Sequence, residues 1–149
     1  MGNIHMQTSF KVIMPEILVF RNDEVLLVKG KENDRIFWWT PGAYWIREKS
    51  CDLQIEEPKQ WIKRVLRSQI HVKLMNAFLR SVSFVAPNHA PVFVYQVDIE
   101  GKPKPNLKRD FLEIDFFKTD NLPEQLGRDE AHGTWLRGLL ATDFVLSSC

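Results

Sequence analysis

The alternation of apolar and polar positions divides the chain into strands, loops and two helices. Two runs rich in strand-forming residues, VIMPEILVF (12–20) and EVLLVKG (24–30), flank a turn-prone RND segment and predict a hairpin. A short apolar run, IFWW (36–39), ends at Pro41-Gly42. Residues 43–57 show no clear period, so we expect them to form a loop.

The segment after this loop has the periodicity of an amphipathic helix. Its apolar residues recur at helical spacing, and its basic residues fall on the other side: Trp61, Ile62, Val65, Leu66 and Ile70 against Lys59, Lys63 and Arg67. Pro58 suits a first helical turn, and Glu56 and Glu57 suit the positive helix N-terminus. The pattern predicts a helix over about 58–70.

The second half of the chain predicts three strands and a closing helix. The strands are expected over VKLMNAFLRSVSFVA (72–86), PVFVYQVDI (91–99) and DFLEIDFFKT (110–119). A turn is expected at 120–126, leading toward a helix over about 131–142. This order of strands, helix, strands and helix predicts an α/β fold, with a mixed sheet covered by helices.

Length and composition are those of one globular domain spanning 1–149. Of the 149 residues, 44% are hydrophobic and 26% charged, and no apolar run approaches the roughly 20 residues of a membrane span. Met1–Phe10 lacks the apolar stretch of a signal peptide, and we expect a poorly ordered lead-in there. Two cysteines, Cys51 and Cys149, are too few for a disulfide framework, which favours a cytoplasmic location.

The charges are segregated along the chain. The net charge of +1 argues against bulk electrostatic binding to nucleic acid or membrane. From Pro58 to Val97 there is no acidic residue, so all 19 Asp and Glu residues lie outside this segment. The segment carries six basic residues, which are Lys59, Lys63, Arg64, Arg67, Lys73 and Arg80.

Several short motifs, in this order and spacing, resemble the Nudix hydrolase superfamily over residues 12–142. The strand VLLVKG (25–30) is followed by WWTPGA, with Trp38, Pro41 and Gly42 at the family's Trp-Pro-Gly positions and Ala43 where a second glycine is usual. LEIDFFKTDNLPEQL (112–126) is similar to the family's late strand and turn. The resemblance implies a Nudix-type α/β/α sandwich.

The family's catalytic motif, the Nudix box, is Gly-x5-Glu-x7-Arg-Glu-U-x-Glu-Glu-x-Gly-U, where U is a bulky aliphatic residue. Its helical glutamates hold Mg²⁺ or Mn²⁺ against a diphosphate. With Arg64 as the motif arginine, Leu66 and Val72 are the aliphatic residues, and Val65, Ser68, Gln69 and His71 occupy the three glutamate positions and the glycine position. A shift by one residue puts Arg64, Arg67 and Ser68 in the acidic positions instead, and an ungapped alignment keeps only Glu57.

No register rebuilds the acidic helix, because the segment contains no acid. The first glutamate of the box falls on Lys49, or on Glu48 after a slip of one residue. The resemblance therefore implies a domain that binds a nucleotide or other phosphate-bearing ligand without efficient metal-dependent hydrolysis. We expect no metal site and no cofactor.

Four residues are the candidates for contact with that ligand. Arg64 could bind phosphate through two nitrogens, or it could equally be a surface charge. Arg67 is the next candidate, although Lys59, Lys63 and Arg67 together are more typical of a solvated helix face than of a binding stripe. Tyr44 and Trp45, in the loop, are the candidates for stacking on a nucleobase. Trp38 is expected in the core.

Two other hypotheses stay open. A divergent Nudix hydrolase of nucleoside diphosphate derivatives would use Mg²⁺ and relocated carboxylates, with Glu56, Glu57 and Glu113 as the catalytic candidates and Glu48 and Asp52 nearby. Glu113 and Asp115 share one strand face, which could equally be a polar outer face. The third hypothesis is an interaction domain without a small ligand. We expect no membrane partner and no nucleic acid, and a homodimer is compatible with the chain.

Overall fold

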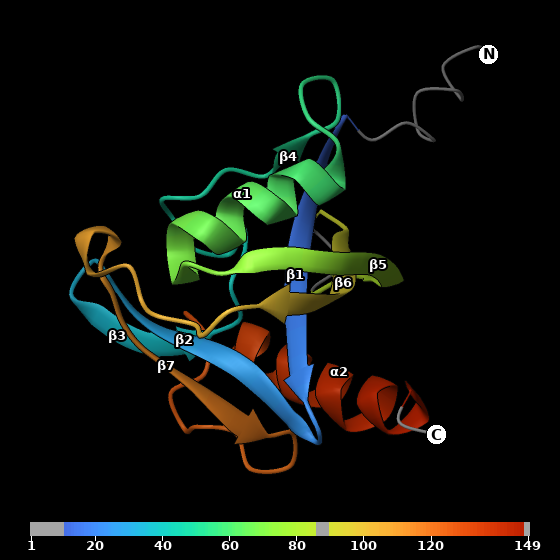
Figure 1. Cartoon of the computed structure of the whole chain (residues 1–149). Helices are drawn as coiled ribbons and strands as arrows, with labels where there is room; N and C mark the ends of the chain where they lie inside the picture. Colours follow the sequence, from blue (N-terminus) through green and yellow to red (C-terminus); the bar gives the residue numbers. More distant parts are fainter. Residues whose placement is uncertain (1–10, 86–89, 148–149) are drawn as a thin grey trace.

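A computed structural model describes residues 11–85 and 90–147 of the chain. The lead-in expected at Met1–Phe10 lies outside the described residues. Figure 1 shows the elements in chain order, which are β1 (Val12–Arg21), β2 (Glu24–Glu32), β3 (Arg35–Trp39), β4 (Cys51–Asp52), α1 (Pro58–Ile70), β5 (Lys73–Ser83), β6 (Val92–Glu100), the 3₁₀ helix η2 (Leu107–Arg109), β7 (Phe111–Lys118) and α2 (Glu130–Ser147). The fold is α/β, as predicted.

The strands form one mixed sheet that splays into two parts. Its order is β3-β2-β1-β6-β5, with β4 paired to β1 and β7 paired to β2. Only the pairing of β1 with β6 is parallel. Because β1 joins β2 only at the hairpin end, through Phe20 and Arg21, the β3-β2-β7 part twists away from the β4-β1-β6-β5 part.

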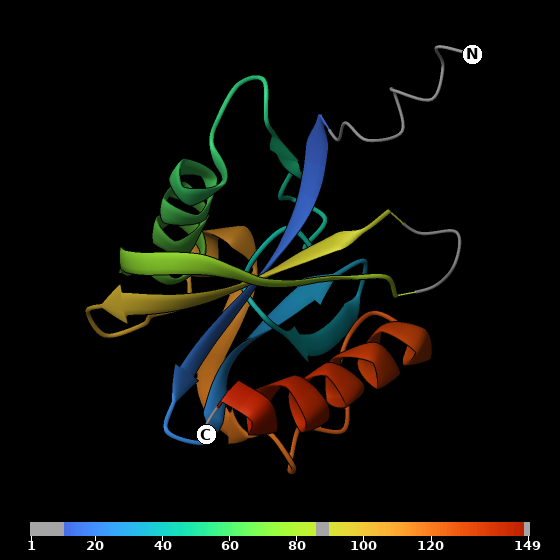
Figure 2. The ribbon, with the colours of Figure 1, turned by 90° about the vertical axis from the view of Figure 1, so that its right-hand side faces the viewer.

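The two helices lie on opposite sides of the sheet, α1 against β5 and β1 and α2 below (Figures 1 and 2). Strands covered on both faces read as continuous apolar runs, and Val25, Leu26, Leu27 and Val28 of β2 are all fully buried. Within the described residues, no helix combines the length and the apolar character needed to cross a bilayer.

The predicted hairpin and the first helix are confirmed. Asn22 and Asp23 form a two-residue turn, in which Asn22 adopts the left-handed conformation that asparagine tolerates (φ 58°). Helix α1 begins at Pro58 and ends at Ile70, and the apolar residues of the predicted stripe are its buried face. His71 closes the helix in the left-handed conformation, and its N–H donates to the carbonyl of Arg67 at 3.2 Å.

The larger differences from the predicted elements lie at the end of β5, at the end of α2 and in the loop after β3. Strand β5 ends at Ser83, short of the predicted 86, because its partner β6 begins at Val92, which pairs with Ser83. Helix α2 extends beyond the predicted end at 142 to Ser147. The apolar residues there, 144–146, are consecutive in sequence and show no helical spacing. The loop predicted at 43–57 is confirmed except for the two-residue β4.

Candidate functional site

The end of α1 is tied to the loop after β3 by a side-chain amide. Gln69, fully buried, accepts a hydrogen bond from the N–H of Gly42 at 2.9 Å and donates to the carbonyl of Gly42 at 3.1 Å. Gly42 has φ of 135°, and a Cβ there would lie 3.0 Å from the carbonyl oxygen of Pro15. Glycine is therefore required where the loop passes between β1 and the helix.

A buried carboxylate and two arginines lie beside this amide. Glu48, whose side chain is only 6% exposed, accepts a hydrogen bond from Gln69 Nε2 at 3.1 Å. Its other neighbours are Arg109 Nη2 at 3.2 Å and Arg64 Nη1 at 3.9 Å. Arg109, from η2, also donates to Ser68 Oγ at 3.0 Å. The Arg109 guanidinium thus lies against the α1 surface formed by Ser68 and Gln69.

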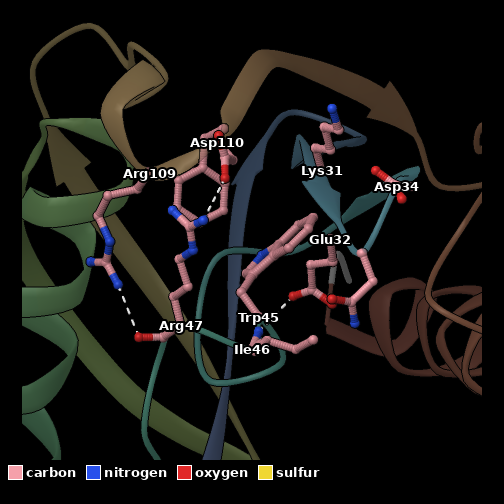
Figure 3. A pocket seen from close by; sticks show the side chains of 10 residues that line it. Lys31, Glu32, Asp34, Trp45, Ile46, Arg47, Arg109 and Asp110 are labelled. Atoms are coloured by element: carbon pink, nitrogen blue, oxygen red, sulfur yellow. Dashed lines mark hydrogen bonds and ion pairs between the residues drawn. The ribbon is translucent and has the colours of Figure 1, made fainter.

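Arg109 is also held from the loop side. Figure 3 shows its guanidinium pointing to the main-chain oxygen of Arg47, at 3.1 Å, while the Arg47 side chain pairs with Asp110 at 2.6 Å. These residues border a cavity of about 240 Å³, into which Trp45 also faces. The Glu32 carboxylate at this cavity also has partners within the protein. It accepts hydrogen bonds from the backbone N–H of Ile46 at 2.5 Å and from the Arg128 guanidinium at 3.0 Å.

A second cavity, of about 330 Å³, lies between β1, the loop after β3 and α2. Its lining is mainly apolar and aromatic, and comprises Met14, Pro15, Glu16, Trp39, Ala43, Tyr44, Val85, Ala90, Val92, His132 and Trp135. The rings stack on one another, with Trp39 centred 4.3 Å from Tyr44 and 6.2 Å from Trp135. We call this cavity the aromatic pocket.

One buried acid lies in the aromatic pocket. Glu16 is 5% exposed, and its Oε1 accepts hydrogen bonds from Trp39 Nε1 at 2.9 Å and from Thr40 Oγ1. Burial raises the pKa of Glu16 from 4.5 to about 8, against the opposing effects of the Thr40 and Trp39 hydrogen bonds and of the Arg128 charge. Glu16 is therefore predominantly protonated at neutral pH.

Comparison with known proteins supports the fold. None of the protein-family models and none of the curated protein sequences matches the chain. Among solved structures, the MutT Nudix hydrolase of Burkholderia pseudomallei is similar over 87% of this chain and 98% of its own, with 18% identity and a TM-score of 0.65. An ADP-ribose pyrophosphatase from Streptococcus suis covers 90% and 92%, with 21% identity and a TM-score of 0.55.

A UDP-X diphosphatase covers 96% of this chain and 70% of its own length, with 16% identity and a TM-score of 0.54. At identities this low the likeness establishes the fold alone, because proteins with unrelated activities can share one fold. The chain has the Nudix fold. In the alignment suggested by the sequence, α1 would occupy the place of the Nudix-box helix, and the left-handed His71 (φ 57°) favours the register in which it takes the position of the box glycine.

The residues at the box positions do not fit a divalent metal. In this register Val65 is buried among apolar residues, Ser68 binds Arg109, and Gln69 is used by Gly42 and Glu48. Mg²⁺ requires carboxylate or other oxygen ligands and is repelled by a neighbouring guanidinium. Within the described part of the chain, no group of three or more His, Cys, Asp or Glu side chains lies where it could hold a metal ion.

The three acids considered as relocated catalysts lie apart, and two of them, Glu56 and Glu113, are paired with basic side chains. Glu56 binds Arg64 through both carboxylate oxygens, at 3.0 and 3.3 Å. Glu57 is the exposed residue before α1, and its side chain makes no capping hydrogen bond. Glu113, on the exposed face of β7, lies 3.4 Å from Lys29. These three candidates do not form one cluster.

The four predicted ligand residues line three different cavities. Arg64 and Arg67 share a shallow recess of about 470 Å³ on the outer surface of α1. Tyr44 lines the aromatic pocket, and Trp45 lines the charged cavity of Figure 3. Trp38, which was expected in the core, is partly buried and packs against it. Tyr44 and Trp45, the stacking candidates of the loop, are more deeply buried and are only 7% and 2% exposed.

Glu16 and Arg109 were missed by sequence reasoning. Glu16 gave a usable signal, because it is the single acid within the apolar strand VIMPEILVF, and acids in buried strands are rare without a role. Arg109 gave none. It lies in a polar loop whose composition predicts exposure, and its contacts are with residues 41 and 62 positions away.

Proposed function

We propose that this Nudix-fold domain binds a nucleotide-like, phosphate-bearing ligand and does not hydrolyse it efficiently with a divalent metal. The observation that carries the proposal is the position of Arg109. Its guanidinium bridges Ser68 and Glu48 at the surface where a Nudix box needs carboxylates. A guanidinium at this place disfavours a divalent metal ion, and the aromatic pocket offers space for a ring.

The aromatic pocket has the properties of a ring-binding site. Its volume of about 330 Å³ falls within the range of small-molecule pockets, which combine apolar walls with a few polar groups. Trp39, Tyr44 and Trp135 supply ring surfaces, and Glu16 supplies a polar atom. Two of the similar structures are named for nucleotide substrates, ADP-ribose and UDP-X, which supports the same ligand class here.

The phosphate contacts proposed are Arg64 and Arg67. The side chains of Arg67 and its neighbour Lys63 form no ion pair with a described residue, so an anion would meet positive charge there without first breaking an ion pair. Arg64 is bound to Glu56, and phosphate would compete with that pair. A series of contacts connects the aromatic pocket with this recess. Gly42, next to the pocket residue Ala43, bonds to Gln69, which bonds to Glu48, and Glu48 lies 3.9 Å from Arg64 of the recess.

Binding is tested by calorimetric titration of nucleoside mono- and diphosphates in EDTA. We expect modest affinity that weakens with added salt, because the proposed cations are exposed and screened. The Arg64→Ala variant should bind more weakly, and Lys59→Ala serves as its control, since Lys59 is an exposed cation of α1 outside the recess. If no nucleotide binds at millimolar concentration, an interaction domain without a small ligand becomes the better account.

Hydrolysis is tested separately with Mg²⁺ and Mn²⁺ on ADP-ribose, dinucleoside polyphosphates and nucleoside triphosphates. Without the metal ligands, transition-state stabilisation worth several kcal/mol is absent, so turnover should stay near background. Robust turnover that disappears in Glu56→Gln or Glu57→Gln would refute this half of the proposal. It would support the divergent hydrolase with relocated carboxylates.

A further inference from the structure

We propose that Glu16 determines the specificity of the aromatic pocket, by donating a hydrogen bond to ligand rings that present an acceptor atom toward β1. This inference rests on the proposed function, which places a ring in that pocket. It adds the chemical class of the ring, which is a heteroaromatic system with a ring nitrogen or carbonyl oxygen at the edge that faces Glu16.

The position of Glu16 is fixed by backbone as well as side chain. It lies on β1 between Pro15 and Ile17 and forms an isolated antiparallel bridge with Gly42. Both hydrogen bonds to the carboxyl group, from Trp39 and Thr40, go to Oε1. No described residue hydrogen-bonds to Oε2. Because Glu16 lines the pocket, Oε2 is the atom of this buried group that is available to a ligand.

The other polar atoms of the rings around the pocket already have partners. The Trp39 N–H donates to Glu16, and the Trp135 N–H donates to Ser83 Oγ at 2.9 Å. The Tyr44 hydroxyl accepts from the N–H of Arg128. His132 Nδ1 lies 2.7 Å from Asp129 Oδ1. A ligand ring therefore meets aromatic surface on its faces, and Glu16 Oε2 is a polar atom of the pocket that has no hydrogen-bond partner among the described residues.

The charged and titratable groups near Glu16 decide which form of the carboxyl a ligand meets. Arg128, which lies over the Tyr44 ring, favours the carboxylate of Glu16. Burial outweighs this charge and the hydrogen bonds from Thr40 and Trp39, so the pKa of Glu16 reaches about 8. Since Oε1 accepts from two donors, the proton resides on Oε2. At neutral pH the pocket thus presents an O–H donor.

This donor discriminates between rings by the hydrogen bond it makes or leaves unmade. A ring with an acceptor atom facing Oε2 accepts a hydrogen bond from the O–H. A ring with only an N–H at that edge cannot, because both groups are donors. One buried hydrogen bond changes affinity by about threefold to tenfold. As pH rises above 8, the protonated fraction falls. An acceptor ring that binds only the protonated form should bind about tenfold more weakly at pH 9 than at pH 7.

The probes for this inference are quinoline, whose ring nitrogen only accepts, and indole, whose ring nitrogen only donates. Both are titrated calorimetrically into the full chain at pH 7 and pH 9. We expect wild type to bind quinoline about threefold to tenfold more tightly than indole at pH 7, and to lose this preference at pH 9. Glu16→Gln keeps an N–H donor and should bind quinoline equally at both pH values.

Glu16→Leu should remove the preference, and Glu24→Gln, at a half-buried acid at the start of β2 that does not line the pocket, should leave it unchanged. A preference or pH dependence that persists in Glu16→Leu overturns the inference, as does tighter binding of indole or no binding of either probe at millimolar concentration. If nucleotides bind in EDTA but Glu16 has no effect, this inference fails alone. If Glu16 selects quinoline but no nucleotide binds, the proposed function fails alone.

Discussion

Replacing Glu16 by glutamine should stabilise the protein, and the gain should grow with pH. Glutamine has nearly the same shape, and its carbonyl oxygen can accept both hydrogen bonds that Trp39 and Thr40 donate to Oε1. It does not titrate. The substitution therefore isolates the free-energy cost of holding an ionisable group at a position that is 5% exposed.

The direction follows from the pKa of Glu16 in the two states. It is about 8 in the folded protein and about 4.5 in the unfolded chain. Between these values the folded state keeps a proton that the unfolded state has released, so wild type loses stability as pH rises from 4.5 to 8 and levels off above 8. At about 1.4 kcal/mol per pH unit, the upper limit of this loss is about 5 kcal/mol.

Local relaxation and water entry lower that limit, and we expect a difference of about 2–4 kcal/mol at pH 9. For a chain of this size the difference corresponds to roughly 6–13 °C in Tm. Thermal unfolding of wild type and Glu16→Gln from pH 5 to pH 9 measures this difference, with Glu24→Gln, at an acid that is 28% exposed, as the control. Two curves that stay parallel across this range would refute the buried, proton-bearing Glu16.

Three further changes test the contacts around α1 by urea unfolding. Arg109→Ala should destabilise the protein by about 1–3 kcal/mol, because the buried Glu48 carboxylate loses its arginine partner. Its control, Arg47→Ala, breaks the exposed ion pair with Asp110 and should cost less than about 1 kcal/mol; equal losses would contradict this account. His71→Gly should stabilise by about 0.5–1 kcal/mol by relieving a left-handed side-chain position, and a loss of stability would speak against it. Gln69→Glu should cost about 2–4 kcal/mol at pH 7, since it removes a donor and sets two carboxylates together, and less at pH 4.5; an equal cost at both pH values would count against charge repulsion.

The accuracy of the sequence predictions follows the strength of the local signal. Helix α1 was predicted with its bounds because the apolar residues at helical spacing agree with Pro58 in the first turn and with the acids before it. The β1–β2 hairpin was predicted for the same reason. Burial in the loop was not predictable, because Tyr44 and Trp45 are buried by rings from β3, β7 and α2 that no local pattern connects to them.

The composition of α1 and its tertiary contacts differ in the same way. The absence of acids from α1 is a property of composition, and it was visible because no alignment could restore them. The contacts of Glu48 and Arg109 with α1 were not visible, since these residues reach the helix from two separate segments of the chain. The Arg109 guanidinium and the Gln69 amide join the loop to the helix, but neither group can polarise phosphorus or activate water as a metal ion does. The proposed function, binding without metal-dependent hydrolysis, is therefore the chemistry that these residues favour.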